Sequence, residues 1–214
     1  DGAVDSHYIL SFLQEGKGLL FKQVGTTEKP DIVVAKMLEG RIAILVDGSP
    51  IVLTLPFVFF EDLQSSNDYY TNPLYVTFMR IIRMLGVFLA AILPGVFLSF
   101  RLYHYKALPL KYLITVANST QGLPFSPFVE MVFILVLFQI LYEVSLRLPR
   151  YLGIATSIVG ALVLGDTGVK AGLISSPVVI IIAMSIIAVY TVPEQAPQLT
   201  VLRVIIIFLG GTLG

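Results

Sequence analysis

Residues 84–100 read MLGVFLAAILPGVFLSF and form an uncharged run of 17 residues between Arg83 and Arg101. A helix of this length can cross the hydrocarbon core of a bilayer if the flanking arginines extend their side chains toward the surface. The Pro94-Gly95 pair in the middle of the run is expected to kink that helix, because proline has no N–H to donate. The run therefore predicts a membrane-spanning helix with a bend.

Further apolar runs follow along the chain. We expect membrane spans at about 81–101, 128–147, 151–165, 171–193 and 199–214. The run 171–193 holds 23 uncharged residues, enough for a complete span. Only 12 uncharged residues precede Glu143, so a span there must carry Glu143 in or near the membrane. Residues 108–128 mix polar, proline and apolar positions, which predicts an amphipathic interfacial helix followed by a proline-rich turn.

Composition supports the same fold class. Of the 214 residues, 56% are hydrophobic and 13% are charged, against about 45–50% and about 25% in soluble domains. This argues against disorder, nucleic-acid binding and an ordinary soluble enzyme. Cysteine is absent, and the two histidines, His7 and His104, lie too far apart to make a metal site alone. We therefore expect no catalytic residues, no metal and no cofactor.

The formal net charge of zero conceals a division of the chain. Residues 1–70 carry five Lys/Arg against ten Asp/Glu, whereas residues 71–214 carry nine against four. We expect a polytopic α-helical membrane protein with a small α/β cytoplasmic N-terminal segment. Residues 1–75 would be the C-terminal part of a soluble domain plus a connector, and residues 76–214 the transmembrane domain. The sequence begins without Met and stops inside an apolar run, so we expect a fragment.

The acidic segment reads as a small α/β structure. Its expected elements are helices at 7–13 and 30–39, a strand at 19–21, and a β-hairpin of 41–46 and 51–55 joined by Asp47-Gly48-Ser49-Pro50. Gly40 is placed to end the second helix. Because both hairpin runs are apolar on both faces, at least one of the two strands should be covered on both sides.

The polar residues inside the apolar spans are the candidate functional residues. Gln139, Glu143 and Arg147 follow at i, i+4 and i+8 and form one helical stripe, with Glu143 in the favourable order to pair with Arg147. Charges at membrane depth usually face a bundle interior, a partner or a water path. The stripe fits a structural ion pair, a pore or ion pathway, or an interfacial position without a role.

Three further intramembrane charges complete this set. Glu130 lies in a first helical turn and points roughly opposite to Glu143. Asp166 and Lys170 interrupt the run that begins at Tyr151. The Gly168 and Gly172 pair permits close helix packing, and a broken or re-entrant element around Asp166 is the alternative.

Basic residues orient the predicted spans. Arg80 and Arg83 precede the first span, and Arg147 and Arg150 follow the second. Both clusters fall on one side if each of these spans crosses once, which places the N-terminal segment in the cytoplasm. The basic loop of 101–111 then lies on the opposite side, which conflicts with the rule that basic loops favour the cytoplasm. An interfacial helix that holds these residues at the level of the lipid headgroups would reduce this conflict but would not remove it.

Residues 36–56, KMLEGRIAILVDGSPIVLTLP, resemble a motif of the GerA family of bacterial spore germination proteins. These are the A-type subunits of nutrient germinant receptors, and a stage V sporulation protein is a close relative. The resemblance continues at Leu93-Pro94-Gly95, Gly122-Leu123-Pro124-Phe125 and Arg147-Leu148-Pro149. The motif residues to which the resemblance gives a structural or assembly role are Lys36, Glu39, Gly40, Arg41, Asp47, Gly48 and Pro50.

The resemblance implies a function. It implies a multi-pass subunit of the spore inner membrane with a cytoplasmic N-terminal region, in contact with the lipid bilayer and without nucleic acid. Its partners would be a nutrient-sensing, transporter-like B subunit and a lipoprotein C subunit. The A subunit would form a homo-oligomeric ion channel that releases ions after nutrient is sensed. A secondary transporter subunit and a membrane scaffold for the germination complex are the alternatives.

Overall fold

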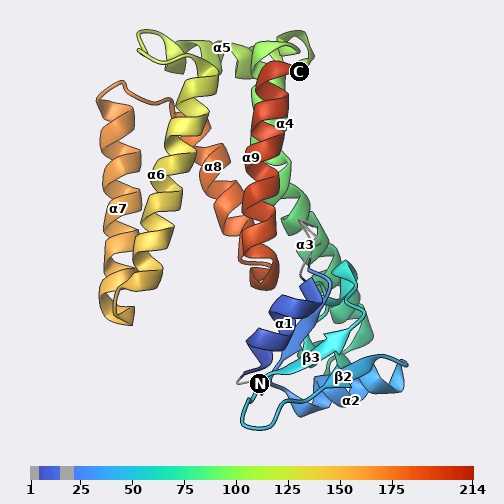
Figure 1. Ribbon diagram of the computed structural model, residues 1–214. Coiled ribbons are helices and arrows are strands. Elements are labelled where there is room, and N and C mark those ends of the chain that lie inside the picture. Colours follow the sequence, from blue (N-terminus) through green and yellow to red (C-terminus); the bar gives the residue numbers. More distant parts are fainter. Residues whose placement is uncertain (1–4, 15–21) are drawn as a thin grey trace. The chain divides into compact units, whose positions relative to one another are not determined.

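A computed structural model describes residues 5–14 and 22–214 of the chain (Figure 1). The expected strand at 19–21 lies outside the described residues. The chain divides into two compact units at Met84 and Leu85. The elements are α1 (Ser6–Gln14), β1 (Gly25–Thr27), α2 (Pro30–Leu38), β2 (Ile42–Ile44), β3 (Val52–Leu55), η1 (Phe59–Glu61), η2 (Ser66–Tyr70), α3 (Pro73–Ala91), α4 (Leu93–Leu102), η3 (Tyr105–Ala107), α5 (Leu110–Thr120), α6 (Pro127–Arg147), α7 (Arg150–Lys170), α8 (Ser176–Val189), η4 (Pro193–Gln195) and α9 (Ala196–Thr212).

The first unit is built on a three-stranded antiparallel sheet with the order β1-β3-β2. The predicted hairpin is confirmed, with Ala43 opposite Thr54 and with Gly48 at φ +80° in the turn. Leu53 and Thr54 point to opposite faces of β3 and are both buried, so this strand is covered on both sides as predicted. The predicted helices at 7–13 and 30–39 are confirmed as α1 and α2, and Gly40, at φ +85°, follows the second.

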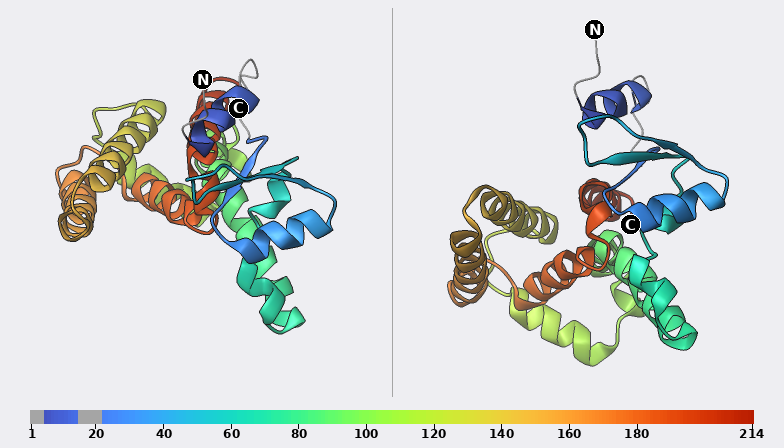
Figure 2. Two further views of the ribbon diagram at one scale, coloured as in Figure 1. Left: turned by 60° about the horizontal axis from the view of Figure 1, so that its bottom comes forward. Right: turned by 90° about the horizontal axis from the view of Figure 1, so that it is seen from below.

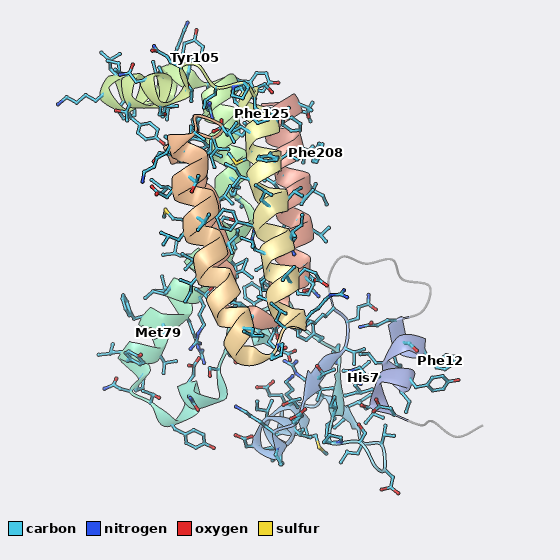
Figure 3. All side chains as sticks on the ribbon, turned by 90° about the vertical axis from the view of Figure 1, so that its left-hand side faces the viewer. His7, Phe12, Met79, Tyr105, Phe125 and Phe208 are labelled. Carbon is cyan, nitrogen blue, oxygen red and sulfur yellow. The ribbon has the colours of Figure 1, made fainter. Side chains whose placement is uncertain are left out.

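The second unit consists of helices that pack in pairs. Helices α6 and α7 lie side by side, as do α4 and α9, and α8 lies between the two pairs (Figures 1 and 2). Helix α5, with its predicted proline-rich turn, lies across one end. The buried core contains Leu98, Met131, Ile134, Val178, Ile182 and Ile207. Phe128 packs edge-on against Phe208 with ring centroids 5.3 Å apart, at the end marked by Tyr105 and Phe125 in Figure 3.

The bend predicted at Pro94-Gly95 occurs as a break between two helices. Helix α3 ends at Ala91, and α4 begins at Leu93 with Pro94 in its first turn. Proline cannot donate a backbone hydrogen bond to the carbonyl four residues earlier, which belongs to Ala90. The predicted span 81–101 therefore consists of two consecutive helices.

Helix α7 corrects two expectations about residues 151–172. It continues without a break through Asp166 to Lys170, so the span does not end at residue 165 and the alternative of a broken or re-entrant element around Asp166 is wrong. The Gly168–Gly172 pair does not share a helix face, because Gly172 adopts φ +64° just after the helix ends. A glycine in this conformation terminates a helix, and the Leu173 N–H bonds back to the Gly168 carbonyl.

Helix α8 is shorter than the uncharged run from which it was predicted. It comprises 14 residues, or about 21 Å at 1.5 Å per residue, because α7 ends just before it and Pro177 stands in its first turn. Within the described residues, three helices are long and apolar enough to cross a membrane: Pro73–Ala91, Pro127–Ser145 and Pro193–Thr212.

Candidate functional site

Two i,i+4 ion pairs lie on the surface of the second unit, and the sequence predicted the first of them, between Glu143 and Arg147. Arg147 Nη2 lies 2.7 Å from Glu143 Oε1, and Lys170 Nζ lies 2.7 Å from Asp166 Oδ2. All four side chains are more than half exposed. The pairs occupy the last turns of α6 and α7, which run antiparallel, so they stand at opposite ends of this helix hairpin.

A second ion pair is buried and joins three helices. Glu130, in the first turn of α6, is fully buried, and its Oε2 accepts a hydrogen bond of 2.9 Å from Nη1 of Arg101 on α4. Its Oε1 accepts from the backbone N–H of Ser175, the residue that precedes α8. Arg101 is only 10% exposed, because the carboxylate of Glu130 holds its guanidinium among the helices.

A third charge, Arg203 on α9, is 1% exposed and lies at the break between α3 and α4. Its Nε donates to the Ala90 carbonyl at 2.9 Å, and the Ser185 hydroxyl donates to the same oxygen at 2.7 Å. This is the carbonyl that Pro94 leaves without an intrahelical partner. Sequence reasoning missed Arg203, although a proline in one apolar run and a lone arginine in another were the signal that could have revealed the contact.

Gln139 separates from the other members of its predicted stripe. It lines a small cavity of about 30 Å³ together with Arg203, Tyr142 and Thr200. Glu143 and Arg147, the next two members, do not line this cavity and pair with each other on the surface. The predicted stripe is therefore divided: Gln139 lines a cavity with the buried arginine, and the other two members lie on the surface.

Three of the motif residues, Lys36, Glu39 and Arg41, line a larger cavity of about 510 Å³ in the first unit. Lys36 Nζ lies 2.7 Å from Glu61 Oε2 and donates to Thr54 Oγ1 at 3.1 Å. Arg41 pairs with Glu61, and its Nη2 lies 3.3 Å from Glu39 Oε2. Gly40 and Gly48 supply positive φ angles after α2 and in the hairpin turn, while Asp47 and Pro50 are exposed around that turn. The motif thus combines two turns with one charge cluster.

The connector before α3 carries one further charged contact. Asp68 accepts two hydrogen bonds from Arg83, of 2.7 Å and 3.0 Å, and a longer one from Arg80. The hydrogen bonds from Arg83 hold the pKa of Asp68 below its ordinary value of 3.8, against the opposing effect of burial. Arg83 also donates to the Leu63 carbonyl, so it anchors the connector to the middle of α3.

Comparison with known proteins identifies the family. The model of the Bacillus/Clostridium GerA spore germination protein family matches residues 1–214. Spore germination protein KA of Bacillus subtilis is 37% identical over 216 residues, which cover 100% of this chain and 40% of that protein. The uncharacterized membrane protein YfkQ of Bacillus subtilis is 36% identical over 216 residues, covering 100% of this chain and 42% of YfkQ.

Other relatives carry similar names. Spore germination protein GerQA of Bacillus cereus is 33% identical over 193 residues, which cover 90% of this chain and 39% of that protein. The chain thus spans about two-fifths of the length of these relatives. No solved structure matches it significantly. The match over the whole chain shows that the protein belongs to the GerA family of spore germination proteins.

Proposed function

We propose that the protein containing this chain is a membrane subunit of a bacterial spore germinant receptor, and that it turns nutrient sensing into ion release as an oligomeric ion channel. The names of its relatives support a role in spore germination. In this proposal the helical unit lies in the spore inner membrane, with the N-terminal region in the cytoplasm. The subunit acts with a transporter-like B subunit and a lipoprotein C subunit, and performs no enzymatic reaction.

The observation that carries this proposal is the buried contact among Arg101, Glu130 and Ser175. One carboxylate joins α4, α6 and the start of α8, so α4 cannot shift against the other two helices without breaking an ion pair. Leaving a buried charge without its partner is strongly unfavourable. In this proposal, a gating movement of α4 would have to break this contact and replace it with another.

The exposed pairs of α6 and α7 support the oligomer. Both pairs lie on helices of predominantly apolar sequence, and charged side chains on such helices usually face a partner, a water path or the membrane surface. In an oligomer, Glu143 and Arg147 of one subunit would face a neighbour or the ion path. This assigns the exposed pair to assembly or conduction, and the buried pair to coupling between helices.

Nutrient-triggered ion release from spores tests the proposal. The full-length protein carrying Glu143→Ala would replace the wild-type subunit, and both ion release and the abundance of the receptor complex would be measured. We expect loss of ion release or of assembly. Wild-type release together with wild-type abundance would refute the role assigned to Glu143.

A secondary transporter subunit is the second candidate, and the broken helix α3–α4 favours it. Transporters commonly place binding sites where membrane helices are interrupted, and Pro94 interrupts this one. This alternative predicts saturable substrate binding to the purified full-length protein without its partners. The channel proposal predicts ion conduction by that same preparation.

A further inference from the structure

Arg203 is a buried cation to which the described residues offer no carboxylate partner. No ion pair joins its guanidinium to an acidic residue within residues 5–14 and 22–214, although it is 1% exposed. A charge removed from water is costly unless it is paired and hydrogen-bonded. The end of helix α3 offers partial compensation, because the Ala90 carbonyl lies in its last turn, where the helix dipole is negative. A partial negative charge leaves much of the positive charge uncompensated.

The guanidinium also retains hydrogen-bonding capacity. It has five N–H donors. Nε donates to the Ala90 carbonyl at 2.9 Å, and Nη2 makes a long contact of 3.5 Å with the Ser185 carbonyl. Nη1 makes no hydrogen bond to any residue that the structure describes. The donors that these two carbonyls do not use are therefore available to a further acceptor.

A cavity lies beside this group. It measures about 30 Å³, and its lining includes Arg203, Gln139, Tyr142 and Thr200. The Gln139 amide and the Tyr142 hydroxyl can both donate, and neither makes a side-chain hydrogen bond to another described residue. The Thr200 hydroxyl already donates to the Ala196 carbonyl. Tyr190, whose hydroxyl can also donate, belongs to the same lining. The polar part of the lining therefore combines one cation with neutral donors and holds no carboxylate. The cavity is large enough for one small ion or water.

A larger cavity adjoins the small one. It measures about 230 Å³, and both cavities share Phe138, Tyr142, Ile186 and Tyr190 in their linings. Apart from Tyr142, Ser145 and Tyr190, its lining is apolar. The space next to the polar end could therefore hold the carbon part of a small organic anion.

We propose that Arg203, Gln139 and Tyr142 form a binding site for a small monovalent anion, either a halide ion or the carboxylate of a small organic acid. The anion would supply the negative charge that Arg203 lacks and would accept hydrogen bonds from all three side chains. Such a ligand stabilises the contact between α9 and the α3–α4 break, because it binds the arginine that joins them.

Chloride binding to the purified full-length protein in detergent micelles tests this site. The measurement is the excess linewidth of the ³⁵Cl nuclear magnetic resonance signal, with sodium gluconate keeping the ionic strength constant. We expect an excess linewidth that saturates with chloride for the wild-type protein. Arg203→Met should weaken chloride binding about tenfold or more, since it removes a charge-assisted hydrogen bond.

A second variant keeps the test informative if Arg203→Met fails to fold. Gln139→Leu leaves the bonds from Arg203 and Ser185 to Ala90 in place, and it should still weaken chloride binding severalfold. Lys111→Met, which removes an exposed cation on α5, is the matched control and should bind like the wild type. A wild type without excess linewidth, or variants that all bind equally, would overturn the proposal.

Competition separates the two sources of the anion. Added sodium acetate displaces chloride if the site takes carboxylates, with the methyl group in the larger cavity. If acetate does not displace chloride but bromide does, the site is restricted to halides. If neither competitor displaces bound chloride, the signal does not come from an anion site and the proposal fails.

Discussion

At the scale of single residues, burial separates two glutamates that look alike in the sequence. Glu143 pairs with a residue on its own helix and is 53% exposed, whereas Glu130 is fully buried and pairs with Arg101 on another helix. An exposed i,i+4 pair contributes little to stability, because water solvates both charges in the folded protein nearly as well as in the unfolded chain. A buried charge deprived of its partner destabilises strongly. The contribution of each glutamate to stability therefore depends on its burial and its partner, and not on residue type alone.

Glu130→Ala should lower the free energy of unfolding by about 3–5 kcal/mol, because it leaves the Arg101 guanidinium buried without a carboxylate. The matched control, Glu143→Ala, should lower it by no more than about 0.5 kcal/mol. Denaturant titration of the full-length protein in micelles measures both values. Equal losses for the two variants would contradict the structural assignment.

Asp68 predicts a dependence of stability on pH. Hydrogen bonds from Arg83 lower its pKa in the folded protein below 3.8, so the unfolded chain binds the proton more readily. The stabilisation from this group is complete above its unfolded pKa and is lost as pH falls through the lower, folded value. We expect the wild type to lose stability below about pH 4 more steeply than Asp68→Asn.

Thermal unfolding of the wild type and of Asp68→Asn between pH 2 and pH 7 measures this difference. Asp68→Asn should be the less stable protein at neutral pH, and the two curves should converge in acid. Parallel curves would show that Asp68 does not titrate differently in the folded and unfolded protein.

The sequence predicted the local contacts of single residues better than the distant ones. The i,i+4 spacing was sufficient for the Glu143–Arg147 pair, because a helix fixes that distance by itself. The contacts of Glu130 with Arg101 and of Arg203 with Ala90 join residues 29 and 113 positions apart. Only the packing of helices brings such residues together, and a single sequence carries no direct record of that packing.

At the scale of elements, glycine and proline set the ends of helices, and glycine permits a close contact between two of them. Helices α4 and α9 meet at Gly95 and Gly210, where a Cβ atom on Gly210 would overlap the Gly95 carbonyl oxygen. A Cβ on Gly95 would lie 2.6 Å from the Ile206 carbonyl oxygen. Both contacts are with backbone atoms, which a rotamer change cannot relieve.

Gly210→Ala should lower the free energy of unfolding by about 1–3 kcal/mol, because the two helices must move apart to admit the methyl group. Gly165→Ala is the control: its Cβ would lie 3.7 Å from the nearest neighbouring atom, an ordinary contact. Alanine also favours the helix by up to about 1 kcal/mol, so this variant should be neutral or stabilised. Denaturant titration distinguishes the two, and an equally stable Gly210→Ala would contradict the close approach.

Elements with local causes were predicted well. The hairpin β2–β3 follows from its turn residues, and α2 from an early proline and a terminal glycine. The two helices α7 and α8 were expected, but the boundary between them was misplaced. Hydropathy ends an apolar run at charged residues such as Asp166 and Lys170, whereas α7 carries these two as an i,i+4 pair and the turn follows in an uncharged stretch. Gly172 supplied the turn there, and its role depends on a φ angle that hydropathy does not report.

At the scale of the whole molecule, the division of charge along the chain follows its division into two units. The acidic residues 1–70 lie within the first unit, and the apolar, basic remainder supplies the helices that could cross a membrane. The GerA family membership and the names of the relatives connect this architecture with spore germination. Ion conduction by an oligomer is the central claim that we add.

Single-channel recording from the purified full-length protein in planar lipid bilayers tests that claim most directly. We predict discrete conductance steps for the wild-type protein and none for Glu143→Ala. Chemical cross-linking of the lipid vesicles that deliver the protein to the bilayer tests whether the protein is inserted and oligomeric. Bilayers that stay silent although cross-linked oligomers are present would contradict the channel, and would leave a scaffold or a transporter subunit as the account of this protein.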